Sequence, residues 1–210
     1  MSQNHTEEKH KRKVNAASMG IVAVLSAIAY ILMFMEFSVP IMPGFIKMDL
    51  SDLPALIGTF AVGPAGGVLI ALIKNLLHLT VTSTAGVGEL SNFILNAVFI
   101  LPAGILYRRR KTRKSACLGA VLGAALMAVV SVASNYFIVY PVYYNFMPEE
   151  TILAAYQAIF PGVKTILQSL ILFNMPFTFV KGMLSVIITM LIYKRLIPVL
   201  NLFWQKRRKN

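Results

Sequence analysis

The 210-residue sequence predicts an all-α integral membrane protein with six transmembrane helices, both termini in the cytoplasm and an outer lid loop between helices 1 and 2. Hydrophobic residues make up 57% of the chain and charged residues 13%, whereas soluble domains are about 45–50% apolar and about 25% charged. The mean hydropathy of +0.70 points the same way. The net charge of +12 comes from short basic clusters between apolar runs, so it indicates membrane topology rather than binding to nucleic acid.

Six apolar runs predict the helices in order. The first, 16–37, is long enough to cross a hydrocarbon core of roughly 30 Å at about 1.5 Å per residue. A secretory signal peptide is the alternative, but the run is too long for one and no cleavage site follows it promptly. The turn signal Gly63-Pro64 separates the second helix from the third. The other five predicted helices are 53–62, 65–82, about 89–107, 115–144 and about 163–193.

The basic residues predict the orientation. Four lie within 9–13, six within 108–114 and six within 194–209, and six helices place all three clusters on one side. The positive-inside rule makes that side the cytoplasm, although four helices would also satisfy it. We therefore expect a disordered basic cytoplasmic tail at 1–15, a membrane domain at 16–197 and a basic cytoplasmic tail at 198–210. Six of the eight acidic residues then fall in outer loops or at outer helix ends: Glu36, Asp49, Asp52, Glu89, Glu149 and Glu150.

The second helix is short for a membrane span. About ten residues make roughly 15 Å of helix, half of the hydrocarbon core. The segment 38–51 before it is too apolar for an exposed loop and too rich in proline and glycine for a helix. Irregular backbone at membrane depth has to be buried in protein or line a cavity. We interpret 38–51 as an outer lid that dips into the bundle, with an interfacial loop as the alternative, and Asp52 as the helix N-cap.

Several polar residues interrupt the apolar runs. Lys74 and Lys181 fall within predicted spans, where a lysine costs on the order of 2.5–3.5 kcal/mol. Asn92 and Asn96 share one face of the fourth helix, and Asn135 lies near the outer end of the fifth. Converging polar groups predict a pocket for a polar, uncharged or planar ligand; internal hydrogen bonds between helices are the alternative. Outer aromatic residues on the last two helices indicate either an interfacial belt or stacking on a flat ring.

Two small-xxx-small steps permit close helix approach, one at Ala23 and Ala27 and one at Gly119 and Gly123. Each serves either packing within the bundle or docking on another membrane subunit. The sequence contains no Walker A loop, HExxH or GxSxG motif, and we expect no enzyme activity, metal site or cofactor. With a single cysteine, Cys117, the chain can form no intramolecular disulfide.

Several motifs, in order, resemble those of riboflavin-specific substrate-binding subunits of energy-coupling factor (ECF) transporters. They are MDLSDLPAL at 48–56, GPAGGV at 63–68, IKNLL at 73–77, Val87-Gly88 with Asn92-Phe93, NYF at 135–137 and PFTFVKG at 176–182. The similarity runs from about residue 16 to 197. It implies a multi-pass cell-membrane protein that captures riboflavin from outside, as a transported ligand rather than a cofactor. The implied partners, besides membrane lipid, are a transmembrane coupling subunit, which would dock at Ala23 and Ala27, and two cytoplasmic ATPase subunits.

The resemblance also implies the ligand contacts. Asn135 and Lys181 match polar contacts to riboflavin, and Asn92 occupies a matching position on the fourth helix. The family pattern has asparagine where this chain has Thr178, so either a water or Asn174, one turn away, is expected to compensate. The full predicted ligand-binding set is Asn135, Lys181, Thr178, Asn92, Asn96, Asn174, Met48, Asp49, Phe45 and Tyr140.

Two alternatives remain open from the sequence. One is a sister subunit for another vitamin, thiamine or a pterin, with the same architecture. A cationic ligand such as thiamine would require Asp or Glu at depth, whereas the acids of this chain lie mostly in predicted loops. The other is a membrane-embedded enzyme or assembly factor acting on lipid, against which the lack of a catalytic cluster argues.

Overall fold

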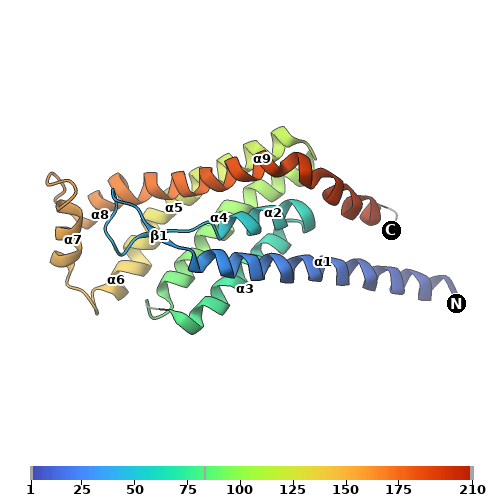
Figure 1. Ribbon diagram of the computed structural model, residues 1–210, viewed down its shortest axis with the longest axis horizontal. Helices are drawn as coiled ribbons and strands as arrows, with labels where there is room; N and C mark the ends of the chain where they lie inside the picture. Colours follow the sequence, from blue (N-terminus) through green and yellow to red (C-terminus); the bar gives the residue numbers. More distant parts are fainter. Residues whose placement is uncertain (1, 83, 209–210) are drawn as a thin grey trace.

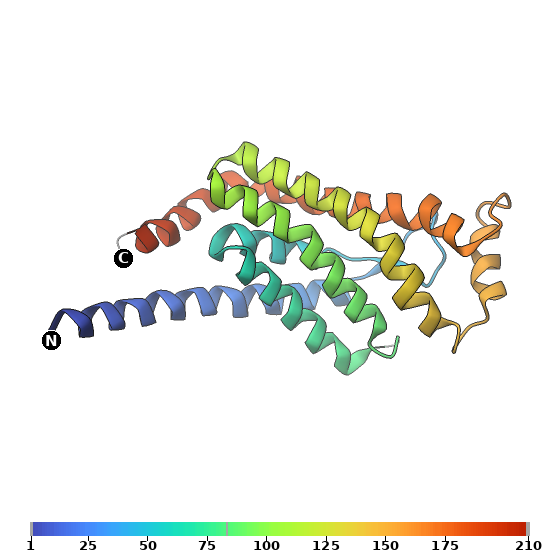
Figure 2. The ribbon, with the colours of Figure 1, turned by 180° about the vertical axis from the view of Figure 1, so that it is seen from behind.

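The computed structural model describes residues 2–82 and 84–208, and it is a bundle of helices with the N- and C-termini at the same end (Figures 1 and 2). Within these ranges, five helical stretches are long and apolar enough to cross a membrane. They are Ala16–Phe34, Pro64–Val81, Val87–Arg109, Arg113–Tyr143 and Ile166–Tyr193, and a shorter apolar helix, Asp52–Val62, accompanies them. The all-α class is thus confirmed.

The two terminal helices extend beyond the apolar runs. Helix α1 is Ser2–Phe34 and helix α9 is Met175–Arg208, so the helices enter both segments for which the sequence predicts polar tails. Both segments are rich in Lys and Arg, and the first also contains two Glu; these residues have high helix propensity. Adding residues to an existing helix is also much less costly than nucleating a new one, because each added residue gains a hydrogen bond.

Helix α2 (Asp52–Val62) has the short length that the sequence predicts, and most of its residues are buried. It ends at Gly63, whose φ of 101° favours glycine, and Pro64 opens α3 (Pro64–His78), so the predicted break is confirmed. The N-cap residue is Ser51 rather than Asp52, which corrects the expectation. The Asp52 carboxylate binds a lysine side chain instead of the helix backbone.

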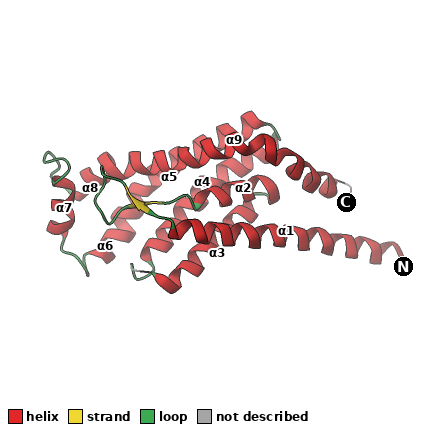
Figure 3. Cartoon of the chain, viewed as in Figure 1, coloured by secondary structure: helices red, strands yellow, loops and turns green. Residues whose placement is uncertain are grey.

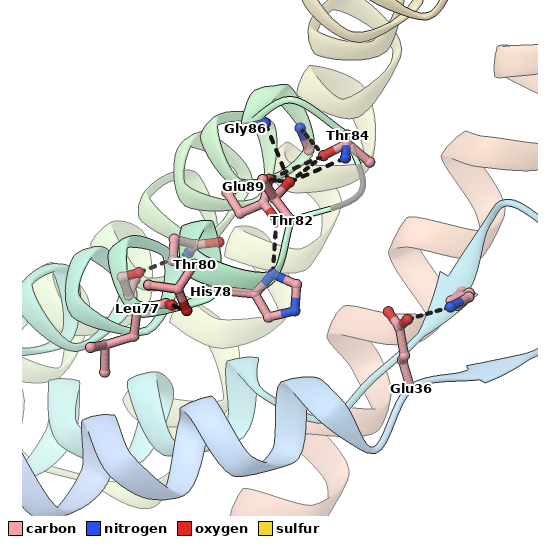
Figure 4. Close-up of polar contacts among 12 residues, drawn as sticks. Glu36, Leu77, His78, Thr80, Thr82, Thr84, Gly86 and Glu89 are labelled. Carbon is pink, nitrogen blue, oxygen red and sulfur yellow. Dashed lines mark hydrogen bonds and ion pairs between the residues drawn. The ribbon is translucent and has the colours of Figure 1, made fainter. Parts of the chain in front are cut away.

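The segment between α1 and α2 runs along the bundle to the end opposite the termini and then returns to the start of α2 (Figures 1 and 3). Its strands β1 (Phe37–Ser38) and β2 (Lys47–Met48) form an antiparallel pair. An ion pair between Glu36 and Lys47 closes the base of this hairpin (Figure 4). The paired strands and the ion pair give the segment a defined shape.

Glu89 organises the connection between α3 and α4 (Figure 4). The connection contains the 3₁₀ turn η1 (Leu79–Val81), and α4 is Val87–Arg109. The Glu89 carboxylate lies 2.8 Å from His78 Nδ1 and accepts hydrogen bonds from the Thr82 and Thr84 hydroxyls at 2.9 and 3.1 Å. One buried carboxylate therefore holds together the end of α3 and the start of α4.

One of the two small-residue steps faces the inside of the bundle, and the other faces outward. Helix α5 (Arg113–Ser134) packs closely on α4 at Gly123. A Cβ added there would lie only 2.0 Å from the Phe99 carbonyl oxygen, so the close approach requires glycine. The Gly119 and Gly123 step thus serves packing within the bundle. Ala23 and Ala27, in contrast, are exposed on the outer face of α1.

The end opposite the termini is built from short elements. α5 continues through the π-helical turn η2 (Asn135–Val139) into α6 (Tyr140–Tyr143), and α8 (Ile166–Ser169) continues through the π-helical turn η3 (Leu170–Asn174) into α9. Helix α7 (Glu149–Gln157) lies between these two stretches in the chain. The buried residues Val139, Tyr140, Ile152, Tyr156, Ile166 and Leu170 form a second core there.

We expect Gly123→Ala to destabilise the bundle, because the new methyl group would overlap the α4 backbone. Overpacking of this kind costs about 1–3 kcal/mol, so thermal unfolding in detergent should shift to lower temperature. Gly20→Ala is the matched control, since nothing lies within 4 Å of a Cβ at that position. Equal unfolding temperatures for the two variants would contradict the close approach of α5 to α4.

Candidate functional site

A cavity of about 180 Å³ lies between α4, the α5–η2–α6 stretch, the η3–α9 stretch and the segment between α1 and α2. Each helical stretch presents residues at spacings of three or four, which place them on one face of a helix. From α4 the lining residues are Gly88, Ser91, Asn92, Leu95 and Asn96; from α5 to α6 they are Met127, Asn135, Val139, Tyr140 and Tyr143; and from η3 and α9 they are Asn174, Phe177, Thr178 and Lys181. Phe45, Ile46, Lys47 and Asp52 complete the lining.

The cavity brings together eight of the ten side chains that the sequence predicts as ligand contacts: Asn135, Lys181, Thr178, Asn92, Asn96, Asn174, Phe45 and Tyr140. Met48 and Asp49 do not line it. Met48 faces a second, largely apolar cavity of about 560 Å³ between the α1–α2 segment and α9. Asp49 is bound to Lys181 instead.

Asn96, one of the α4 asparagines that line this cavity, has a side-chain oxygen without a hydrogen-bond partner among the described residues. Asn96 Nδ2 donates to the Asn92 side-chain oxygen at 2.8 Å and to the Asn92 backbone carbonyl at 2.9 Å. Asn96 is only 1% exposed, and its Oδ1 has no hydrogen-bond partner among the described residues. A buried acceptor without a partner costs about 1–3 kcal/mol, so a ligand that donates a hydrogen bond here would recover that energy.

The two π-helical turns place Asn135 and Asn174. Asn135 begins η2 and Asn174 ends η3, and a proline follows each turn, at Pro141 and Pro176. A proline has no N–H and so removes a hydrogen bond within a helix, and a π turn accommodates the change in the helix. Such turns occur frequently at functional sites. The two prolines are the sequence signal for this geometry.

A chain of three hydrogen-bonded side chains supports the outer wall of the cavity. The hydroxyls of Tyr140 and Tyr156 lie 2.5 Å apart, and Tyr156 donates to Asn174 Oδ1 at 2.6 Å. Tyr156, on α7, is fully buried, and this burial raises the pKa of its phenol, so it remains a neutral donor. Phe45 contacts the Tyr156 ring edge-on at 6.2 Å between ring centroids. Tyr156 thus connects the helices of the wall with the α1–α2 segment.

Two lysines and two aspartates form a buried charge cluster beside the cavity. Lys181 Nζ lies 2.8 Å from Asp49 Oδ2 and 3.6 Å from Asp52 Oδ2, and Lys74 Nζ lies 2.9 Å from Asp52 Oδ1. The backbone N–H of Ser51 donates to Asp49 Oδ1 at 2.8 Å. Burial raises the pKa of Asp49, but the nearby Lys181 and Lys74 ammonium groups outweigh that effect and hold it below its usual range. Asp49 is therefore charged at neutral pH.

This cluster corrects one expectation from the sequence. Asp49 lies in the segment before α2 and Asp52 at the start of that helix, as the sequence predicts, but both are buried rather than exposed, and each is bound to a lysine. Ten further residues line the cavity that the sequence does not single out as ligand contacts, Asp52 and Ser91 among them. Ser91 lies three residues after Gly88 and four before Leu95, a spacing that places the three on one helix face, whereas nothing local indicated the partners of Asp52.

The lining is chemically suited to a flat, polar, uncharged molecule. Amide and hydroxyl groups offer donors and acceptors, tyrosine and phenylalanine rings offer apolar faces, and the charged groups of the cluster are paired with one another. Thr178, at 9% exposed, lies one turn from Asn174 on the same wall. Among the described residues, no three His, Cys, Asp or Glu side chains gather in a way that could hold a metal ion.

Comparison with known proteins gives consistent matches. A family model described as the substrate-specific component of ECF transporters matches residues 17–193. The chain is 34% identical over 175 residues to the riboflavin transporter RibU of Staphylococcus aureus (strain TCH60), covering 83% of this chain and 87% of that protein. It is 32% identical over 183 residues to the riboflavin transporter FmnP of Bacillus subtilis (strain 168), covering 85% and 90%.

The fold matches as well. A solved structure, that of the S component of a bacterial ECF transporter, superposes with a TM-score of 0.70 at 31% identity. The match covers 89% of this chain and 98% of that chain.

Tyr156→Phe should destabilise the end of the bundle opposite the termini, because it leaves Asn174 Oδ1 and the Tyr140 hydroxyl without their shared partner. Loss of one partner of a buried hydrogen bond costs about 1–3 kcal/mol, and thermal unfolding in detergent measures it. Tyr144→Phe, at a more exposed tyrosine, should change the unfolding temperature little. If both variants unfold like the wild type, the hydrogen-bonded chain does not support the wall.

Proposed function

Because the chain belongs to the family of ECF transporter substrate-specific components, we propose that it captures riboflavin from outside the cell and delivers it to an ATP-driven transporter. The family makes the chain a multi-pass component of a membrane transporter and not an enzyme. The relatives named above are riboflavin transporters, and their identity to this chain extends over most of its length.

The observation that carries the proposal is the convergence of polar and aromatic residues on one cavity, with the buried Asn96 Oδ1 left unsatisfied. Riboflavin combines a flat ring system bearing carbonyl and N–H groups with a hydroxyl-rich ribityl chain. The asparagines and Thr178 can pair with such groups, and Tyr140 and Phe45 offer faces for the ring. We assign ligand contact to the eight residues of the predicted set that line the cavity. To Met48 and Asp49 we assign a role in the loop that covers them.

The charge cluster favours riboflavin over a cationic vitamin. A ligand such as thiamine would need an unpaired carboxylate, whereas Asp49 and Asp52 are each paired with a lysine. An uncharged pterin would fit the same chemistry, so a pterin-specific subunit is the remaining alternative. Competition experiments separate these ligands directly.

We propose that 38–51 is the lid over the ligand and that α2 completes a sixth, half-length span. Phe45, Ile46 and Lys47 from this segment line the cavity at the end of the bundle away from the termini. The basic run 108–114 spans the end of α4 and the start of α5, at the end of the bundle where both termini lie (Figure 1), which supports a cytoplasmic location for both termini under the positive-inside rule. The lid and the cavity would then face the outside.

To couple uptake to ATP hydrolysis, we propose that the chain associates with a transmembrane coupling subunit and two cytoplasmic ATPase subunits. The sequence itself contains no Walker A motif. Ala23 and Ala27 are exposed on α1, and small side chains on an outer helix face allow a second helix to approach closely. These two residues are therefore the proposed docking surface.

We expect the detergent-purified chain, stripped of endogenous ligand, to bind riboflavin at one site and quench its fluorescence, with weak competition by thiamine. Asn135→Ala should weaken binding roughly tenfold or more, because a lost hydrogen bond of about 1–3 kcal/mol corresponds to that factor. Asn145→Ala, at an exposed asparagine outside the cavity, should bind like the wild type. Absence of quenching by a folded sample would refute riboflavin as the ligand.

A bulky residue on the exposed face of α1 should block docking without affecting ligand binding. Ala27→Trp is expected to abolish co-purification with the coupling subunit while leaving the riboflavin titration unchanged, because Ala27 lies outside the cavity. Ala125→Trp provides the matched control, since Ala125 is exposed on α5 instead. Equal loss of the complex in both variants, or in neither, would show that α1 is not the docking face.

A further inference from the structure

Lys74 is a fully buried lysine that the proposed ligand contacts do not explain. It lies on α3, its side chain is 0% exposed, and it is not among the described residues that line the cavity. Its ammonium group donates to Ser51 Oγ at 2.5 Å and to Asp52 Oδ1 at 2.9 Å. Both of these hydrogen bonds go to the residues where α2 begins.

Asp52 connects Lys74 to the cavity. Its Oδ1 accepts from Lys74, and its Oδ2 lies 3.6 Å from Lys181 Nζ. Asp52 and Lys181 both line the cavity, and Lys181 is bound on its other side by Asp49 at 2.8 Å. A change at Lys74 therefore reaches the ligand through one intermediate side chain.

The cluster is balanced in charge. Its titratable members are Asp49 from the α1–α2 segment, Asp52 from α2, Lys74 from α3 and Lys181 from α9. Two ammonium groups thus face two carboxylates. His78 on α3 and Glu89 on α4 lie outside this cluster, because they pair with each other: His78 Nδ1 is 2.8 Å from a Glu89 carboxylate oxygen. Removing one member of the cluster would leave a surplus buried charge, which is strongly unfavourable until it takes up or loses a proton.

We propose that Lys74 is a positioning residue that acts through Asp52: it keeps the charge cluster neutral and so holds the Lys181 ammonium in the cavity wall, where an uncharged ligand binds. This inference rests on the proposed riboflavin-binding function. Replacing a buried ion pair by apolar groups is often neutral for stability, so the pair's contribution is expected in binding rather than in folding.

The test is a double-mutant cycle of Lys74→Met and Asp52→Asn, read as riboflavin affinity between pH 5.5 and pH 9. Each single variant should weaken binding about tenfold or more at pH 7.5. The pH profiles, taken relative to the wild type, should then tilt in opposite directions. Lys74→Met leaves a surplus carboxylate and should regain affinity as the pH falls, because protonation restores neutrality. Asp52→Asn leaves a surplus ammonium and should regain affinity as the pH rises.

The double variant keeps the Asp49–Lys181 pair and adds no surplus charge, so it should bind within about threefold of the wild type across the whole range. Lys164→Met, at an exposed lysine, controls for the substitution itself and should have no effect. A purely structural role would lower affinity equally at every pH. Parallel profiles, or a double variant as weak as the weaker single variant, would overturn the inference.

The double-mutant cycle remains interpretable if a variant fails to fold or if the wild type fails to bind. If Lys74→Met does not fold, the comparison of Asp52→Asn with the double variant still decides the question, because only charge balance predicts that the second substitution restores binding. If the wild type itself fails to bind riboflavin, the proposed function is refuted. If the wild type binds and the profiles stay parallel, this inference alone is refuted.

Discussion

A segment of irregular backbone enters a bundle of membrane-spanning helices, and its polar groups have to be satisfied there because hydrocarbon offers no hydrogen bonds. Helix α2 has only 11 residues, about 16 Å, and its first turn is accordingly buried inside the protein. Lys74 and Lys181 neutralise the two aspartates at this point, and Asp49 in turn binds the Ser51 backbone. The cavity, the segment before α2 and the short second helix all depend on this cluster.

The cavity walls reflect the same constraint in a different way. Three helical stretches direct asparagine, threonine and tyrosine side chains inward, and most of these groups have a partner within the protein. Asn96 Oδ1 is an exception, buried and without a partner among the described residues. Under the proposed function, such a group would favour a ligand that supplies the missing donor, and so would contribute to selectivity as well as to affinity.

Close helix contacts and open helix faces have separate roles in this bundle. The glycines of α5 let its backbone touch that of α4, which fixes the wall that carries Asn92 and Asn96. The alanines of α1 resemble them in spacing, but they are exposed. The same sequence pattern therefore serves packing within the bundle in one helix and lies on an exposed face in another, and only the packing of the chain distinguishes the two.

The sequence by itself determined the all-α membrane class, the break at Gly63-Pro64, the short second helix and several of the polar residues that line the cavity, among them Asn92, Asn96 and Asn135. These features follow from composition, hydrophobic length and spacing along one helix, which are local properties of the chain. The tertiary structure decided which charges pair, which small-residue step lies inside the bundle and that Tyr156 supports Asn174. The pairing of Lys181 with Asp49 joins residues 132 positions apart, and contacts of that kind depend on how helices pack, which no local pattern encodes.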